Sequence, residues 1–341
     1  MGGLGKLRNK LIIGLLLGVV VVAGLAIYAD FNKMVAVLRD FEWWLLPPIL
    51  LFTLFNYALR FYKWDVYLRL IGATGVPKKD SLLIFLSGLA MAMTPGKVGE
   101  LLKSYLLKQV RGTPISVSAP IVVAERLTDG IAMLVLAAVG LFMFNYGTAL
   151  LVGIAVFVVV FLFIFQNRTL AGKLLSMGER LPVISRGVQH FHAFYESSYE
   201  LFRLPNLLFG VGIGVVSWFG EVIALVLVMV GLHIPFSALL VVICAFILSA
   251  STLIGSITLL PGGLGTTDAS IAGMLQFLIP AQLGIAMAES TAVAATLIIR
   301  FATLWFGVGI GLVALALMQR RLGRLALPEE ESAQALSAEQ C

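Results

Sequence analysis

Residues 206–231 read NLLFGVGIGVVSWFGEVIALVLVMVG, a stretch of 26 residues in which Glu221 is the one charged side chain. A helix that crosses the hydrocarbon core of a bilayer needs about 20 consecutive apolar residues, so this stretch is long enough to span. Comparable apolar runs occupy 11–29 and 291–318. None of them alternates with the period of two that outer-membrane strands require, so the pattern predicts transmembrane helices.

The composition extends this prediction to the whole chain. Of the 341 residues, 60% are hydrophobic and only 12% are charged, and the mean hydropathy is +1.01. A soluble domain carries about 25% charged residues, so this chain lacks the polar surface that water requires. We expect an all-α polytopic membrane protein with about six full spans, at 11–29, 44–60, 115–144, 148–166, 206–231 and 290–318.

Two further segments are interrupted by proline and glycine. Proline removes a backbone donor and glycine frees the backbone, so the helix should break at both places. Broken backbone at membrane depth survives where protein or a watery cavity satisfies it, which favours two re-entrant helical hairpins. The predicted helices are 81–94 and 98–109 in the first hairpin, and 237–260 and 266–279 in the second. The tips are Pro95, Gly96, Gly99, Pro261, Gly262, Gly263 and Gly265.

The distribution of basic residues supports this topology. If each hairpin returns to the side it entered, 19 of the 24 lysines and arginines lie on the side of both termini. Two lie on the opposite side, and Lys97, Arg126 and Arg300 lie within the membrane. The positive-inside rule then places both termini in the cytoplasm, with 30–43 and 281–289 outside. The residues assigned to the cytoplasmic side include Arg60, Lys63 and Lys103.

The same arrangement contains an inverted repeat. Each half reads span, span, hairpin, and then a span with an arginine, which is Arg126 in the first half and Arg300 in the second. Transporters with inverted repeats bind substrate near the midplane, where such breaks meet. The predicted division is a cytoplasmic N-terminus at 1–10, a first membrane repeat at 11–146, a second at 147–320 with the cytoplasmic segment 167–204, and a cytoplasmic tail at 321–341.

Charged side chains stand inside the predicted spans. Helical spacing puts Glu125 and Asp129 on one face, with Arg126 within reach of Asp129. Arg300 and Glu221 lie near the middle of two other spans. A charge at the bilayer centre costs at least a few kcal/mol on insertion scales, so these residues need a role. Either they contact a ligand, or they pair with one another to hold the bundle together.

Each hairpin also presents the N-terminus of its second helix at membrane depth. Free backbone N–H groups and the positive end of the helix dipole make such a terminus an anion site. Lys97 lies in the first tip, where it can meet a phosphate. In the second tip, Asp268 either caps the helix that begins after Gly265 or pairs with Arg300.

Recognisable catalytic patterns are missing from the sequence. It contains neither H-E-x-x-H nor G-x-S-x-G. Cys244 and Cys341 give neither a metal site nor a disulfide framework. We therefore expect no enzyme activity, no metal and no cofactor. The net charge of +6 is explained by loops that face an anionic leaflet, so we expect no nucleic-acid partner.

Three motifs carry a resemblance to a known family: TPGKVGELLK at 94–103, AERLTD at 124–129 and LPGGLGTTD at 260–268. Their order and spacing over about residues 10–320 resemble the lysylphosphatidylglycerol synthase transmembrane-domain family, the flippase portion of the multiple peptide resistance factor proteins. Members usually have a charged pair and an aspartate where this chain has AERLTD, and often a basic residue at the place of Lys97. The second motif often ends in glutamate, where this chain has Asp268.

The resemblance implies translocation of a lipid across the inner membrane. The chain ends before the soluble aminoacyl-transfer domain of multidomain members, so we expect a stand-alone member that does not make lysylphosphatidylglycerol. The expected cargo is an anionic phospholipid or a polyprenyl-phosphate-linked envelope precursor; the alternative function is a membrane-embedded transferase or an accessory subunit of an envelope synthesis complex. Membrane lipids are the expected partners, and a homodimer is possible. The expected lipid-binding residues are Lys97, Glu100, Glu125, Arg126, Asp129, Glu221, Asp268 and Arg300.

Overall fold

The computed structural model describes residues 2–94, 99–143 and 188–338. All regular structure in these ranges is helical, which confirms the predicted all-α class. The helices are α1 (Gly2–Tyr28), α2 (Phe31–Asp40), α3 (Leu46–Leu70), α4 (Lys78–Ala90), α5 (Leu102–Arg111), α6 (Ile115–Met143), α9 (Val188–Phe202), α10 (Leu204–Gly231), α11 (Ala238–Ile257), α12 (Thr266–Leu283), α13 (Glu289–Arg300) and α14 (Phe306–Ala338).

Five of these helical segments are long and apolar enough to cross a membrane, and a bent pair of helices makes a sixth candidate. The bent pair joins Ile13–Tyr28 to Phe31–Asp40 at 97°. The chain is therefore a multi-pass membrane protein, and the predicted span at 148–166 lies outside the described residues. The five single segments are Trp43–Leu70, Ile115–Met143, Leu204–Gly231, Ala238–Ile257 and Glu289–Gly323.

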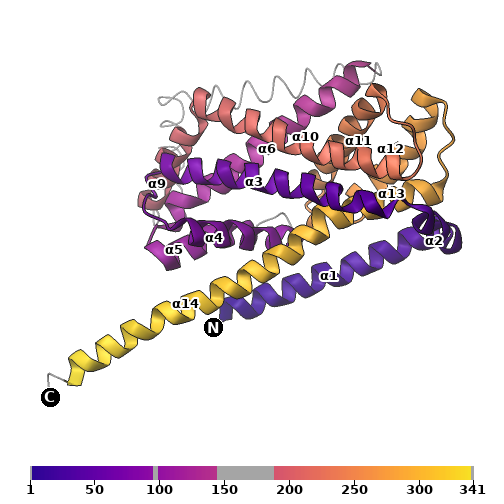
Figure 1. The fold of residues 1–341 in the computed structure, drawn as a ribbon. Coiled ribbons are helices and arrows are strands. Elements are labelled where there is room, and N and C mark those ends of the chain that lie inside the picture. The colour runs from indigo at the N-terminus through magenta and orange to yellow at the C-terminus, as the bar shows by residue number, and fades with distance from the viewer. Residues whose placement is uncertain (1, 95–98, 144–187, 339–341) are drawn as a thin grey trace.

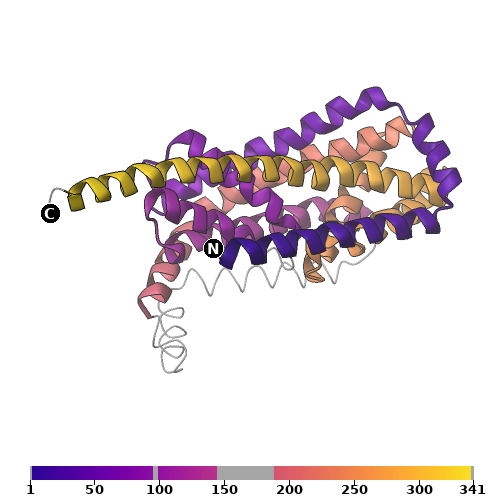
Figure 2. The ribbon, with the colours of Figure 1, turned by 90° about the horizontal axis from the view of Figure 1, so that it is seen from below.

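The helices form an elongated bundle whose two ends differ (Figure 1). Both chain termini lie toward the end that holds α5 and α9, and α2 lies at the other end. The C-terminal part of α14 projects beyond the bundle in both views (Figure 2). This places both termini on one side of the bundle.

An antiparallel pair, α3 and α10, packs together along its length. Gly220 of α10 permits the close approach, since an added Cβ there would lie 3.0 Å from Phe55 Cδ1. At the same contact Asn56 Nδ2 donates to the carbonyl oxygen of Ser217 over 3.0 Å. This bond satisfies one donor of the buried amide, which would otherwise be costly in an apolar bundle.

Two further pairs of helices pack beside α3 and α10. Helix α4 packs along α14, and α11 packs along α6. The short turn Met91–Met93 at the end of α4 contacts the turn Pro261–Gly263 after α11. The helices on either side of each break also pack against each other, α4 with α5 and α11 with α12. The turn before the first break thus meets the second break inside the bundle, while the division into two inverted repeats stays a prediction.

The second helical pair differs from the short re-entrant segment that the sequence suggested. Helix α11 has 20 residues, so it measures about 30 Å and is long enough to cross the hydrocarbon core by itself. The re-entrant form of this hairpin is therefore not confirmed. Helix α12 also passes the predicted end at 279 and stops at Leu283, with Gly284 at φ 67° as its cap. Pro280 lies in the last turn, where its missing N–H and its ring disturb a single turn only.

One predicted span boundary was wrong, and one predicted span contains an irregular turn. Helix α3 continues ten residues past the expected end at residue 60 and includes Lys63, which is fully buried. The charge that suggested a helix end is neutralised inside the bundle, so the helix need not leave the membrane there. The last predicted span is interrupted by a π-helical turn at Phe301–Trp305. Such turns are often found at functional sites, and this one follows Arg300 directly.

Candidate functional site

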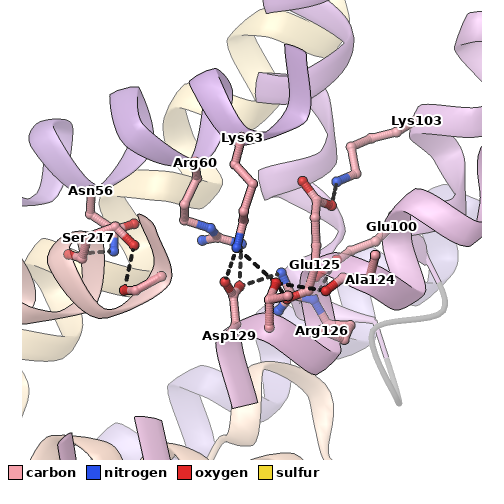
Figure 3. A network of polar contacts seen from close by, with 12 residues as sticks. Asn56, Arg60, Lys63, Glu100, Lys103, Ala124, Glu125, Arg126, Asp129 and Ser217 are labelled. Carbon is pink, nitrogen blue, oxygen red and sulfur yellow. Dashed lines mark hydrogen bonds and ion pairs between the residues drawn. The ribbon is translucent and has the colours of Figure 1, made fainter. Parts of the chain in front are cut away.

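Asp129 of α6 lies at the centre of a charged cluster that joins three segments of the chain (Figure 3). Its carboxylate contacts Lys63 Nζ at 2.6 Å, Arg126 Nη2 at 3.2 Å and Arg60 Nη2 at 3.6 Å. Arg126 is three residues before Asp129 on the same helix, as the sequence predicted, while Arg60 and Lys63 reach it from α3. A carboxylate with three cationic neighbours stays charged and holds them in fixed positions.

Lys63 has no exposed surface. It also donates to Thr128 Oγ1 over 3.2 Å. A lysine buried at membrane depth is costly unless it is paired and hydrogen-bonded, and both conditions hold here. Lys63 therefore serves to anchor Asp129 rather than to meet a ligand.

A second buried pair lies beside the first. Lys103 of α5 forms an ion pair with Glu125, and both side chains are 5% exposed or less. The ammonium group of Lys103 lies 4.9 Å from the ring centroid of Trp64, within the range of a cation–π interaction. Gly88 of α4 leaves room for the lysine stem, since an added Cβ would lie 2.9 Å from Lys103 Cδ.

Arg126 is the most exposed basic residue of the cluster, with 28% of its side chain accessible. Its Nε lies 3.3 Å from Glu100 Oε2, but this buried nitrogen makes no hydrogen bond. The distance permits charge attraction while the angles do not permit a hydrogen bond, so the pairing is loose. The guanidinium keeps donor capacity for a further anion.

Arg300 has an equivalent arrangement in the second half. Its Nε donates to Asp268 Oδ1 over 2.6 Å and its Nη2 to the carbonyl oxygen of Gly262 over 2.7 Å. Asp268 Oδ2 in turn accepts a hydrogen bond from the Gly265 N–H over 2.8 Å. Asp268 therefore has both predicted roles: its carboxylate caps α12 and also pairs with Arg300. Arg126 thus contacts Glu100, which follows the first break, and Arg300 contacts Asp268, which follows the second.

Both arginines line one cavity of about 130 Å³ between α3, α4, α6, α10, α11 and α13. A single water needs roughly 10–15 Å³, so the space suits a hydrated group of several heavy atoms. Four basic side chains and two acidic ones contribute to the wall, together with aromatic side chains and the glycines of the second break. These residues are Arg60, Lys103, Arg126, Arg300, Glu100, Glu221, Tyr57, Trp218, Gly262 and Gly263.

The predicted site residues therefore divide into three groups. Glu100, Arg126, Glu221 and Arg300 line the cavity. Glu125 pairs with Lys103, and Asp268 pairs with Arg300. Asp129 contacts Arg60, Lys63 and Arg126. Of the first tip, Gly99 is described and its N–H donates to Thr94 Oγ1 over 2.9 Å, whereas Pro95, Gly96 and Lys97 lie outside the described residues.

Sequence reasoning missed three basic residues of this site. Arg60, Lys63 and Lys103 were assigned to the cytoplasmic side, and the structure places all three in the cluster. The spacing of polar residues after position 56 indicates that the helix continues past residue 60. Asn56, Arg60, Lys63 and Tyr67 follow the i, i+4, i+7, i+11 spacing of one helix face, which extends the polar face past the predicted end.

Comparison with known proteins identifies the fold family. Residues 15–311 match the family described as lysylphosphatidylglycerol synthase TM region. A UPF0104 membrane protein of Methanothermobacter thermautotrophicus is 26% identical over 336 residues, which cover 91% of this chain and 96% of the relative. A second UPF0104 membrane protein of the same organism is 23% identical over 279 residues, which cover 76% of this chain and 80% of the relative.

Proposed function

The chain belongs to the lysylphosphatidylglycerol synthase TM region family, and from that premise we propose that it moves an anionic lipid across the cytoplasmic membrane. The cargo is an anionic phospholipid or a lipid-linked envelope precursor with a phosphate. The family match supports a role connected with membrane lipids. The observation that carries the proposal is the cavity that Arg126 and Arg300 line together.

The arginine and lysine side chains of the cavity wall can donate hydrogen bonds to an anion. Four cations and two carboxylates face this space, while Asp129, Asp268 and Glu125 contact the cations from behind. An arginine presents two parallel N–H donors that match two oxygens of a phosphate. The supporting carboxylates hold the guanidinium groups in place before a ligand arrives, which lowers the entropy cost of binding.

The position of the cavity favours movement rather than storage. Arg126 and Arg300 come from the two halves of the chain, and the turns Met91–Met93 and Pro261–Gly263, which contact each other, contribute Ala92, Gly262 and Gly263 to the same cavity. A phosphate held between two such elements can be passed toward either leaflet when the halves rock against each other, as in other transporters with midplane sites. We propose a multi-pass protein with both termini in the cytoplasm and with no catalytic step of its own.

Reconstitution into liposomes tests the proposal. Proteoliposomes contain phosphatidylglycerol with a fluorescent headgroup, and a membrane-impermeant reductant is added outside to bleach the accessible fraction. We expect bleaching of the inner-leaflet fraction in proteoliposomes and its absence in protein-free liposomes, with no nucleotide added. Equal bleaching in both would refute the proposal. A new lipid product that forms only when a donor substrate is added would instead support the membrane-embedded transferase.

A further inference from the structure

We propose that an acyl chain of the lipid occupies an apolar groove beside the cavity, between α6 and the end of α11. The inference rests on the proposed function, because it assigns the place of the tail of the same lipid. The groove has a volume of about 220 Å³. Gly130 and Met133 of α6 form one wall, and Leu253, Leu259 and Leu260 form the other.

The groove continues directly from the cavity. Arg126, Gly255 and Ser256 line both spaces. Arg126 thus stands at the junction, and beyond it the groove is walled mainly by Met133, Leu253, Leu259 and Leu260. This order of surfaces matches an amphiphile whose phosphate lies at Arg126, whose headgroup extends into the cavity and whose hydrocarbon chain extends into the groove. Asp129 also reaches the groove, but its carboxylate is paired with Lys63.

The end of α11 creates the open space. The helix stops at Ile257, and the chain turns through Leu259, which has a φ of 55°. Apolar side chains remain exposed at this turn, with Leu259 at 63% and Leu260 at 40%. On the opposite wall, a Cβ added to Gly130 would meet no atom of the described residues within 4 Å. Hydrocarbon is the ligand that such a surface favours, because it brings no polar group that the leucines would leave without a hydrogen-bond partner.

Photolabelling of the full-length protein in mild detergent tests the inference. The probe is phosphatidylglycerol with a diazirine near the end of one acyl chain, supplied at about one molecule per protein so that the detergent covers the rest of the surface. Labelled peptides are identified by mass spectrometry. We expect label on the groove segments of α6 and the α11 turn, and its displacement by unlabelled phosphatidylglycerol. Diacylglycerol with the same chains and the same diazirine lacks the phosphate, so it should label the groove about tenfold less.

Groove-filling variants sharpen the test. Gly130→Phe, and independently Leu260→Trp, should each reduce groove labelling about tenfold, because the added ring removes the place of about two methylene groups. Gly309→Phe on α14 is the matched control, since a Cβ there also meets nothing within 4 Å among the described residues and the position lines neither space. Size-exclusion profiles confirm that each variant is folded, and at least one groove variant with the parent profile is required for the comparison.

The outcomes separate this inference from the proposed function. Label that spreads evenly over groove and exposed segments such as that of Phe142, and that unlabelled lipid does not displace, overturns the groove even if liposomes show translocation. Displaceable groove label in a protein that does not translocate lipid leaves the groove as a lipid site and overturns the transport proposal. Labelling that persists undiminished in a folded Gly130→Phe or Leu260→Trp variant also overturns the groove.

Discussion

Lys63 Nζ lies 2.6 Å from Asp129 Oδ1, and the lysine has 0% of its side chain exposed. The pair joins α3 to α6 in the interior of the bundle. Asp129 also contacts Arg126, so the fully buried lysine fixes the carboxylate that in turn orients a cavity-lining arginine. Ion pairs with residues that do not line the cavity, such as Asp129, therefore fix the positions of its basic side chains.

Breaking the Lys63–Asp129 pair should destabilise the bundle. Asp129→Leu leaves Lys63 buried without a counter-charge, and we expect a loss of about 3–5 kcal/mol in the free energy of unfolding. The double variant Lys63→Met, Asp129→Leu should recover part of this loss, because no buried lysine remains while Arg60 and Arg126 still lose their contact with Asp129. Chemical unfolding in detergent measures both. The prediction is wrong if the double variant is as unstable as the single one.

Substitution of either cavity arginine should slow lipid translocation. Arg126→Lys, Arg126→Gln, Arg300→Lys and Arg300→Gln each remove bidentate phosphate contacts, and a charge-assisted hydrogen bond of about 1.5–3 kcal/mol corresponds to a loss of about tenfold or more. Arg203→Gln is the control, since its side chain is 58% exposed and pairs with Glu200 at the surface. Folded Gln variants that move lipid at the parent rate would show that these arginines are structural.

The two roles of Asp268 should separate by substitution. Asp268→Asn keeps an oxygen acceptor for the Gly265 N–H but loses the charge opposite Arg300, whereas Asp268→Ala loses both. We expect the Ala variant to be less stable than the Asn variant by about 1 kcal/mol, the usual value of a helix cap. Both should translocate lipid more slowly than the parent. Equal stability of the two variants would argue against the cap.

The orientation in the membrane can be read from single cysteines. The loop between α3 and α4 lies at the end of the bundle that holds both termini, and the loop between α12 and α13 lies at the opposite end. Lys79 stands just after the first loop and Ala286 within the second, and both positions are exposed. The two variants are Lys79→Cys and Ala286→Cys. Cys341→Ser removes the terminal thiol, and Cys244 is buried. In intact cells an impermeant maleimide should label Ala286→Cys and spare Lys79→Cys, as the positive-inside rule requires. The reverse pattern would place the termini outside.

The helices of this protein follow from local sequence. The run 206–231 has one charge in 26 residues and forms α10 at Leu204–Gly231, because a helix satisfies the backbone groups of such a run within the segment itself. The break at Pro261–Gly263 was also visible, since proline and glycine act on their own backbone. The cluster of Glu125, Arg126 and Asp129 followed from helical spacing along one segment.

The charge contacts between helices were decided by the tertiary structure, whereas the Arg126–Asp129 contact follows from spacing within α6. Lys63 and Asp129 are 66 positions apart, and Arg300 and Asp268 are 32 apart, so no local pattern identifies the partners. The sequence ended the span near Arg60 because an isolated charge is costly in lipid. The folded chain keeps Arg60 and Lys63 inside, since Asp129 on another helix neutralises them at short range. The cost of a charge depends on its neighbours in space, and only packing of the helices supplies those neighbours.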